Sequence, residues 1–237
     1  LNDIHAIAIH CYMASPSAVK DYIKKFEKYG KPIWMTEFCA WDPVPSNVEK
    51  QMDYMCSVLN HMERNPHVER YAWFMPRTSG KVDSAPYMQL LTHGSPVELT
   101  PLGQIYTQFS SFDKNAYLPL QQGVGAHQYI ALREENISLR VTEDNKLYIQ
   151  SFMQEQWIDY QVNIENKMPL QIQYASIVNS QVCIYIDGVA QAIVELPKTA
   201  DLQTKTTLST AIIPPLGNHT LRLEALKGTF NCYQLLQ

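Results

Sequence analysis

The hydrophobic pattern of this chain changes its period near residues 114–127, and this change constrains the fold more than any other feature. Before it, short apolar runs alternate with segments whose apolar residues recur every three or four positions, as on one face of a helix. After it, apolar and polar residues alternate one by one, as in half-buried strands. The sequence therefore predicts two domains joined by a connector at 114–127, and an overall class of α/β plus all-β.

The first domain, expected at residues 1–113, is predicted to alternate strands with helices. Ser46 with Glu49 three residues later has the pattern of a capping box and predicts the start of the second helix. This alternation predicts parallel strands covered by helices. Strands are expected near 5–12, 33–40 and 68–75, and helices near 18–29, 46–64 and 100–112.

The second domain, expected at residues 128–237, is predicted to be an antiparallel β-sandwich. Asp187-Gly188 is a hairpin-turn signal between two alternating segments. Seven or more short strands without a helical pattern are typical of a sandwich. They are expected near 146–152, 157–164, 170–175, 181–186, 191–196, 208–213 and 219–226.

Composition narrows the possible partners. The net charge is −4 and no basic stripe is present, which argues against nucleic acid as a partner. No apolar run approaches the roughly 20 residues that span a bilayer, so no membrane segment is expected. The five cysteines are widely spaced and odd in number, which indicates neither a disulfide framework nor a metal site. We expect no metal and no cofactor.

Residues 31–42 contain the strongest candidate for chemistry. Glu37 lies toward the C-terminal end of a predicted strand that a helix follows, the position at which barrel enzymes place catalytic groups. Trp34, Phe38 and Trp41 surround it in sequence. Aromatic rings of this kind stack on the C–H faces of sugars, so the guest is expected to be a sugar ring. For Trp41, packing under the loops is the alternative.

Three segments of the first domain resemble the end of a TIM-barrel glycosidase. They are Ile9-His-Cys-Tyr12, Pro32-Ile-Trp-Met-Thr-Glu-Phe38 and Val68-Glu-Arg-Tyr-Ala-Trp-Phe74. Their order and separations are similar to those of glycoside hydrolase family 128, which acts on β-1,3-glucans. The resemblance implies a partial (β/α)8 barrel that comprises strands six to eight and their helices.

The same resemblance implies roles for individual side chains. Glu37 matches the family's nucleophile, and His10 and Tyr12 match strand-six positions that shape the sugar site. Trp73 matches an aromatic residue of strand eight beside the scissile bond, with ordinary packing as the alternative. The predicted catalytic residue is thus Glu37, and the predicted substrate-binding residues are His10, Tyr12, Trp41 and Trp73.

The family's acid/base Glu lies on strand four, for which this sequence has no counterpart. A retaining glycosidase needs two carboxyl groups about 5–5.5 Å apart. Three βα units also cannot close a barrel. We therefore expect a companion polypeptide, or a missing N-terminal half, to supply strands one to five, and we expect the chain to be inactive without it.

The second domain resembles a family 6 carbohydrate-binding module. The segments that carry the resemblance are Trp157-Ile-Asp-Tyr-Gln-Val-Asn-Ile164, Ile184-Tyr-Ile-Asp-Gly188, Gly217-Asn-His-Thr-Leu-Arg-Leu223 and Thr229-Phe-Asn-Cys-Tyr233. In that family two aromatic rings and an Asn hold a sugar. Tyr148 matches the first ring and Asn231 the Asn, but residues 202–205 contain no second ring. Tyr233 replaces an expected acid, which puts the family's calcium site in doubt.

The expected function is retaining cleavage of β-1,3-glucan by the assembled protein, with polysaccharide as the partner of the sandwich. Two alternatives stay open. One is a related glycosidase that acts on another β-glycan, and the other is a polysaccharide-binding protein without catalytic activity. A secreted, cell-surface or periplasmic location is expected, since polysaccharides of this size lie outside the cell.

Overall fold

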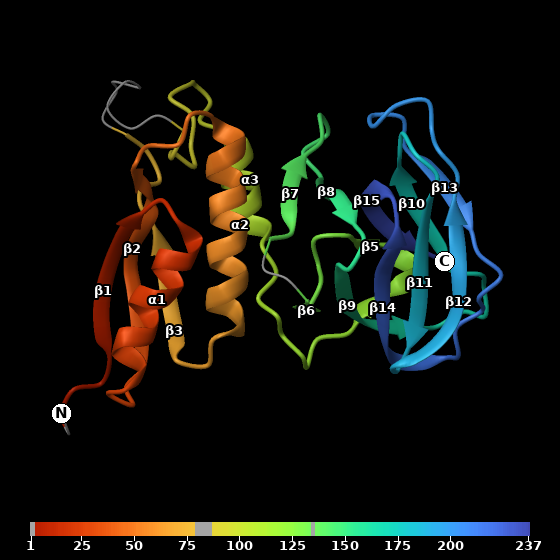
Figure 1. The fold of residues 1–237 in the computed structure, drawn as a ribbon, viewed down its shortest axis with the longest axis horizontal. Coiled ribbons are helices and arrows are strands. Elements are labelled where there is room, and N and C mark those ends of the chain that lie inside the picture. The colour runs from red at the N-terminus through yellow and green to blue at the C-terminus, as the bar shows by residue number, and fades with distance from the viewer. Residues whose placement is uncertain (1–2, 79–86, 134–135) are drawn as a thin grey trace. The chain divides into compact units, whose positions relative to one another are not determined.

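The computed structural model describes residues 3–78, 87–133 and 136–237. The chain divides into two compact units, Leu1–Gln108 and Phe109–Gln237, which are drawn in Figure 1. The first unit contains helices and parallel strands, and the second consists almost entirely of strands. The predicted combination of an α/β part with an all-β part is confirmed.

The first unit is built on a three-stranded parallel sheet in the order β1-β2-β3. A helix follows each of its first two strands, as the alternating pattern predicts. The elements are β1 (Ile7–Met13), α1 (Pro16–Glu27), β2 (Ile33–Asp42), α2 (Val48–Arg64), β3 (Val68–Trp73) and α3 (Pro101–Gln108).

Local sequence signals explain where the helices begin. The Ser15 hydroxyl accepts a hydrogen bond from the backbone N–H of Ala18 and caps α1. For α2 the predicted cap at Ser46 is wrong. The Asn47 side chain accepts from the N–H of Lys50 at 2.9 Å, and the helix begins one residue later. Both residue types cap well, so the spacing alone does not distinguish them.

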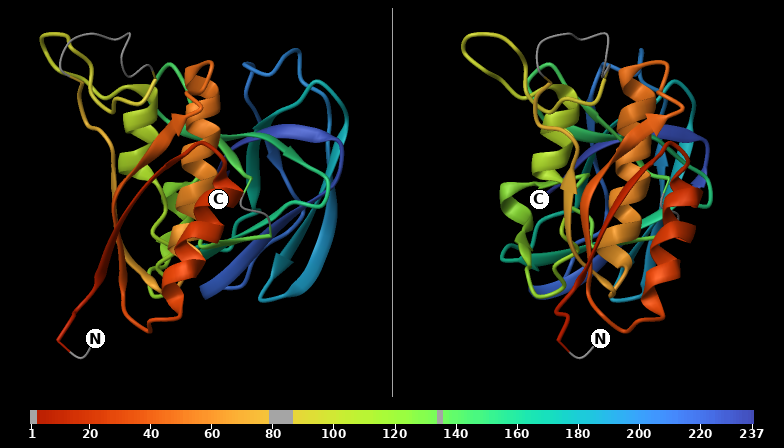
Figure 2. Two further views of the ribbon diagram at one scale, coloured as in Figure 1. Left: turned by 60° about the vertical axis from the view of Figure 1, so that its left-hand side comes forward. Right: turned by 90° about the vertical axis from the view of Figure 1, so that its left-hand side faces the viewer.

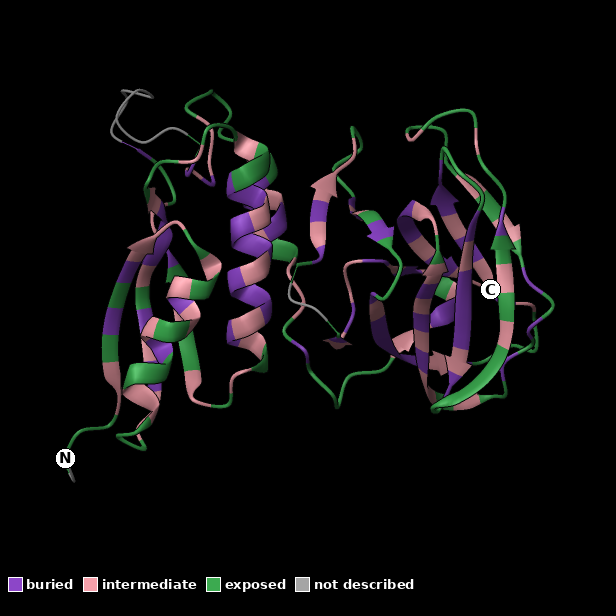
Figure 3. Ribbon diagram, viewed as in Figure 1, coloured by how far each residue is buried: buried purple, intermediate pink, exposed green. Residues whose placement is uncertain are grey.

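Helices α1 and α2 pack against one face of the sheet, where strand residues such as Ile9 and Met35 meet Ile23 and Met55 in the core. The two views of Figure 2 show these helices beside the strands. The opposite face carries Ala8, His10, Tyr12, Trp34 and Thr36, all of them exposed or half-exposed. Figure 3 shows the resulting alternation of buried and exposed positions along the strands.

The second unit is a sandwich of two sheets, as predicted. One sheet has the order β13-β10-β15-β8-β7 with β5 paired to β15, and the other has the order β12-β11-β14-β9-β4 with β6 paired to β9. The strands are β4 (Leu118–Pro119), β5 (Val124–Gly125), β6 (Ala131–Leu132), β7 (Ser138–Val141), β8 (Leu147–Met153), β9 (Trp157–Ile164), β10 (Gln171–Ala175), β11 (Ser180–Ile186), β12 (Val189–Leu196), β13 (Thr206–Ser209), β14 (Gly217–Lys227) and β15 (Thr229–Leu236).

Residues 114–127, predicted as a connector, are part of the sandwich. β4 pairs with β9, and β5 pairs with β15. Leu120, Val124 and Ala126 are fully buried. This segment has too few apolar residues to show a hydrophobic period, so the sequence pattern did not reveal that it packs into the sandwich.

Large aromatic side chains fill the sandwich core. The hydroxyl of Tyr160 donates to the Ala126 carbonyl at 2.8 Å, and that of Tyr174 donates to the Pro197 carbonyl at 2.8 Å. These bonds satisfy polar groups that would otherwise destabilise the core. At the predicted β11–β12 hairpin turn, Asp187 and Gly188 have φ values of 49° and 79°, as a type I′ turn requires.

Candidate functional site

Glu37 lies in the C-terminal half of β2, where the parallel register sets it beside His10 of β1. The Tyr12 hydroxyl donates a hydrogen bond to Oε2 of Glu37. Nδ1 of His10 lies 3.4 Å from the same oxygen. Three residues predicted from the sequence therefore meet at one carboxylate, on the face of the sheet that carries the exposed side chains.

Tyr12 is a neutral hydrogen-bond donor to this carboxylate. Burial, followed by the hydrogen bond to Glu37, raises the pKa of Tyr12 well above its ordinary value. A phenol that keeps its proton fixes one carboxylate oxygen of Glu37. The Glu37 side chain is 35% exposed, so the carboxylate is both held in place and accessible to a reacting group.

Aromatic rings surround the Tyr12 side of this carboxylate. The Tyr12 ring meets Trp41 edge-on at 6.1 Å and Phe74 edge-on at 5.5 Å between centroids. Trp41 and Phe74 lie 6.0 Å apart. Trp41, predicted to contact a sugar, is half-buried in this cluster. Phe74 was not predicted as a site residue.

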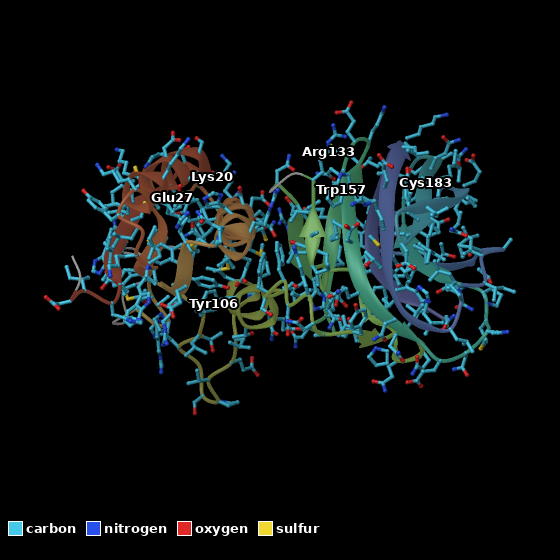
Figure 4. The ribbon with its side chains drawn as sticks, turned by 90° about the horizontal axis from the view of Figure 1, so that it is seen from below. Lys20, Glu27, Tyr106, Arg133, Trp157 and Cys183 are labelled. Atoms are coloured by element: carbon cyan, nitrogen blue, oxygen red, sulfur yellow. The ribbon has the colours of Figure 1, made fainter. Side chains whose placement is uncertain are left out.

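Trp73 does not lie where the sequence prediction placed it. Its side chain is only 5% exposed, and its indole N–H donates to the Met88 carbonyl at 2.7 Å. Its ring packs against Phe38 and Tyr54. The hydroxyl of Tyr106, which is labelled in Figure 4, accepts a hydrogen bond from the backbone N–H of Trp73.

Two features account for these positions. Successive residues of an extended chain point to opposite faces, so Phe74 lies beside Tyr12 and Trp41 while Trp73 packs against Tyr54 of α2. A register shift between Met35 and Phe38 adds a residue to β2, so that Met35 and Phe38 are both buried while Glu37 lies beside His10. This irregularity is not visible in the sequence.

Glu69, the acid of β3, does not complete a catalytic pair with Glu37. It lies near the start of its strand, where Val68 pairs with Ile33 at the beginning of β2. The indole N–H of Trp34 donates to its carboxylate at 2.7 Å, and His5 lies 3.9 Å from it. These contacts hold Glu69 at the opposite end of the strands from the Glu37 cluster.

A groove of about 450 Å³ runs along β1 and α1 beside the candidate site. His10 and Tyr12 contribute to its wall from β1, and Ala18 and Tyr22 contribute from α1. In the sheet order, β1 is an edge strand that pairs with β2 alone. The groove therefore follows a strand edge that is open within the described residues.

The sandwich contains a second concave site, a pocket of about 560 Å³ that includes both predicted residues, Tyr148 and Asn231. The Tyr148 ring stacks on Tyr233, with centroids 4.8 Å apart and planes 24° from parallel. The β8–β15 register, which pairs Ile149 with Cys232, brings the two tyrosines side by side. Tyr233 was missed as an aromatic partner because only this register reveals it.

Asn231 forms part of the pocket wall but is 3% exposed. Its Oδ1 accepts from the backbone N–H of Ser151 at 3.0 Å, and its Nδ2 donates to the Leu202 carbonyl at 3.3 Å. The Tyr233 hydroxyl donates to the same carbonyl at 3.0 Å. The Asn231 amide thus positions the loop around residue 202, and its direct contact with a sugar stays a prediction.

In comparisons with known sequences, each unit matches the model of a carbohydrate-active family. The family model described as "Glycosyl hydrolase catalytic core" matches residues 2–106. The model described as "Carbohydrate binding module (family 35)" matches residues 133–235. The predicted resemblances of both halves are confirmed at this level, although the matching sequence model of the second half is that of family 35.

More particular relatives match only parts of the chain. Alkali-sensitive linkage protein 1 of Schizosaccharomyces pombe is 40% identical over 79 residues, which are 32% of this chain and 15% of that protein. The chain therefore spans a small fraction of the length of this curated relative.

Two similar solved structures correspond to the two halves. An endo-β-1,3-glucanase of glycoside hydrolase family 128 from Pseudomonas viridiflava shares 30% identity, with a TM-score of 0.37, over 44% of this chain and 39% of that one. A β-1,3-glucan-binding family 6 module from Bacillus halodurans shares 17% identity, with a TM-score of 0.46, over 51% and 98%.

Within residues 3–78, 87–133 and 136–237, no group of three or more His, Cys, Asp or Glu side chains is placed to hold a metal ion. No helix among the described residues has the length and apolar character needed to cross a membrane. All five cysteines lie in the described part of the chain, where they are buried and form no disulfide bond.

Proposed function

We propose that the assembled protein is a retaining glycoside hydrolase that cleaves β-1,3-glucan, and that the sandwich binds polysaccharide. The observation that carries the catalytic part is the accessible Glu37 carboxylate, held by Tyr12 and His10 on the exposed face of the sheet. The match to the glycosyl hydrolase catalytic core over residues 2–106 supports it.

Glu37 acts as the nucleophile of a double displacement. Its free carboxylate oxygen attacks the anomeric carbon and forms a covalent glycosyl-enzyme, while the glycosidic C–O bond breaks and a second, acid/base carboxyl group protonates the departing oxygen. The same group, now a carboxylate, takes a proton from the water that attacks the glycosyl-enzyme and releases Glu37. Tyr12 keeps the other oxygen in place throughout, since its raised pKa preserves the donated proton. His10 binds a sugar hydroxyl or orients Glu37, and Trp41 and Phe74 provide an apolar surface for the sugar ring.

The acid/base carboxyl group comes from polypeptide that lies outside the three strands. The candidate acid Glu69 is held at the wrong end of the sheet. Further barrel strands, supplied by a companion polypeptide or another part of a longer one, would pair with the open edge of β1 beside its groove. A secreted, cell-surface or periplasmic location follows from the polymeric substrate.

Covalent labelling tests the catalytic role directly. The assembled enzyme is incubated with a 2-deoxy-2-fluoro-laminaribiosyl fluoride, which forms a slowly hydrolysed glycosyl-enzyme, and the labelled peptide is identified by mass spectrometry. We expect the label on Glu37, and we expect Glu37→Gln to lower laminarin hydrolysis on the order of 10³-fold or more. Glu69→Gln is the matched control and should keep most of the activity. A label on another residue would remove Glu37 from the nucleophile role.

A polysaccharide-binding protein without catalytic activity is the second candidate. The observation that favours it is that the Glu37 cluster holds one carboxylate, whereas cleavage with retention needs two. Under this function, Glu37→Gln changes glucan affinity but no hydrolysis is measured with any assembled form. Activity on a mannan or galactan instead of laminarin would indicate the related glycosidase.

A further inference from the structure

Strand β14 begins with a match to the N-glycosylation pattern Asn-x-Ser/Thr. Asn218-His219-Thr220 has a residue other than Pro in the middle position, as this pattern requires. Neither the proposed catalysis nor the proposed sugar binding uses these residues. The match matters because the proposed polymeric substrate places the chain outside the cell, and exported chains meet the enzyme that attaches N-linked glycans.

The Asn218 side chain leaves free the atom to which an N-glycan is joined. Asn218 is exposed, and its Oδ1 accepts a hydrogen bond from Nδ2 of Asn163 at 2.7 Å. The pairing of β14 with β9 sets these two residues opposite each other. Among the described residues, Nδ2 of Asn218 donates to no partner. A glycan is attached through Nδ2 and leaves Oδ1 as an acceptor, so the modified side chain can keep its bond to Asn163.

Two exposed apolar side chains lie near Asn218. Leu216, two residues earlier in the chain, is 50% exposed, and Val189 is 64% exposed. The His219 ring holds their segments together, because its Nδ1 lies 2.7 Å from Oδ2 of Asp187 and its Nε2 lies 3.3 Å from the Leu216 carbonyl oxygen. Val189 begins β12 directly after the turn that contains Asp187. We call Leu216 and Val189 the apolar end of the sandwich.

A glycan on Asn218 is an occupant that fits the apolar end. Two residues span at most about 7 Å, so the first sugar rings on Nδ2 can reach the Leu216 side chain. Sugar rings cover apolar groups with their C–H faces and turn their hydroxyl groups to water. Exposed apolar patches promote association in solution, whereas a surface glycan is bulky and solubilising. The modification would therefore replace apolar surface with hydrated surface.

We propose that Asn218 carries an N-linked glycan when the chain is exported through a eukaryotic secretory pathway, and that this glycan covers the apolar end. Nδ2 forms a bond to C1 of an N-acetylglucosamine and loses one proton to a base of the oligosaccharyltransferase. The C1–O bond to the diphosphate of a lipid-linked oligosaccharide breaks, and the lipid diphosphate leaves with the bonding electrons. This inference rests on the extracellular location in the proposed function, and on neither catalysis nor sugar binding.

A second match to the pattern, Asn136-Ile137-Ser138, is not part of the proposal. Asn136 follows residues 134–135, which lie outside the described part of the chain. Its glycosylation is followed separately in the experiments, with Ser138→Ala as the change that removes this match.

Glycan mapping tests the site. The 237-residue chain is secreted from a yeast host behind a secretion signal and treated with peptide N-glycosidase in heavy-oxygen water, which converts each glycosylated Asn to a labelled Asp. We expect mass spectrometry to find the label at position 218. Thr220→Ala should lose it, whereas Thr220→Ser, which keeps the pattern, should retain it. Both variants keep the backbone N–H of Thr220 that bonds Asp187.

Translation of the chain into microsomes gives a second measurement that depends on neither folding nor secretion. In the Ser138→Ala chain we expect a slower-migrating product on a gel, which an endoglycosidase converts back to the unmodified size. The further change Thr220→Ala should abolish this product, and Thr220→Ser should preserve it.

Association in solution tests the cover of the apolar end. Of the two secreted variants, Thr220→Ala should associate several-fold more than Thr220→Ser by light scattering, and should bind more of an apolar dye. Leu216→Ser in the Thr220→Ala chain should reverse most of this increase. Ile177→Ser is the matched control, since Ile177 is 56% exposed and precedes β11, at the opposite end of that strand from Asp187. The open edge of β1 is the same in all these variants.

Two results would overturn the proposal. An Asn218 that stays unmodified both in the secreted chain and in microsomes would remove the site. A glycan on Asn218 with equal association of Thr220→Ala and Thr220→Ser would remove the cover of the apolar end. Neither result bears on Glu37, whose covalent labelling decides the catalytic part, and a label on another carboxylate would leave the glycan mapping unaffected.

Discussion

The two units differ in how many of their strands are hydrogen-bonded to a neighbouring strand on both edges. In the sandwich, β9, β14, β11, β10 and β15 each pair with neighbours on both sides. Among the described residues of the α/β unit only β2 does so, because β1 and β3 are the edges of a three-stranded sheet. Most long strands of the sandwich are thus inner strands, whereas two of the three strands of the α/β unit are edge strands.

This difference separates two kinds of site. The Tyr148 pocket is made entirely of residues from one unit, so its properties can be derived from this chain. The Glu37 cluster has one held carboxylate and an aromatic wall, and the proposed retaining chemistry would need a second carboxyl group from outside these three strands. A site at the C-terminal ends of parallel strands is built from residues of several strands, so its properties depend on every strand that contributes a residue.

Matched core truncations should show the largest difference between the units. Phe38 is fully buried against Tyr71 and Trp73, and Phe230 is 1% exposed against Phe152. Each Phe→Ala change should cost about 3–5 kcal/mol. We expect Phe38→Ala to abolish the cooperative fold of the α/β unit, whereas Phe230→Ala leaves a folded but weakened sandwich. Urea unfolding followed by NMR signals of each unit checks this.

The expected difference between the units would be contradicted if both units stayed folded in both variants and the two substitutions lowered the free energy of unfolding equally. In that case the two units have similar reserves of stability, and the unpaired edges of β1 and β3 contribute little. Leu226→Ala, at a half-exposed position of β14, controls for the loss of apolar volume outside the core.

The Asp159–Arg222 pair predicts a smaller effect, confined to the sandwich. The Arg222 guanidinium donates two bonds to the Asp159 carboxylate, at 2.7 and 2.9 Å, and lies 3.8 Å over the Trp157 ring. Trp157 and its neighbour Arg133 are labelled in Figure 4. Asp159→Asn should lower the free energy of unfolding of the sandwich by about 2 kcal/mol, since the bidentate charged bond is lost. The signals of the α/β unit should not move in the same titration.

The smallest predicted effects are two pH dependences of opposite sign. Burial raises the pKa of Glu63 in the α/β unit, although the hydrogen bond donated by Tyr71 opposes this rise. Because the pKa of Glu63 is higher in the folded state, its contribution to the free energy of unfolding is present below the unfolded-state pKa of about 4.3. That contribution is lost as the pH rises through the folded-state pKa. Glu63→Gln should therefore reduce the pH dependence of the free energy of unfolding of the α/β unit, and should lower that free energy little at pH 7.

Asp187 of the sandwich should behave in the opposite way. The backbone N–H of Thr220, followed by the His219 side chain, lowers the pKa of its carboxyl group. The contribution of Asp187 to the free energy of unfolding is therefore present above the unfolded-state pKa of about 3.9 and is lost as the pH falls through the lower folded-state pKa. Asp187→Asn should destabilise the sandwich slightly at pH 7 and not at pH 2. Equal slopes in the two units between pH 3 and 7 would contradict both assignments.

The sequence predicted elements whose signals are local. The Asp187-Gly188 turn and the helix that ends at Arg64 follow from turn chemistry and from a regular period. The convergence of His10, Tyr12 and Glu37 was expected from family resemblance together with the position of Glu37 near the end of a strand. The roles of these residues in catalysis stay predictions.

What the sequence could not predict depends on register between strands distant in the chain. The shift beside Met35 adds a residue to β2 and sets Glu37, instead of Thr36, beside His10. The pairing of β8 with β15 sets Tyr233 beside Tyr148, 85 positions away in the printed numbering. No period or motif contains this information, because both arrangements satisfy the same alternation of apolar and polar residues.

The open edge of β1 has a practical consequence for anyone who produces this chain. A row of unpaired backbone donors and acceptors is a template on which another strand can form, whether it belongs to the intended neighbour or to a second molecule of the same kind. Within the described residues, β1 bonds to β2 alone. Under the proposed function, co-expression with polypeptide that supplies the neighbouring strands, rather than a change of buffer, is therefore the first remedy to test if the purified protein aggregates.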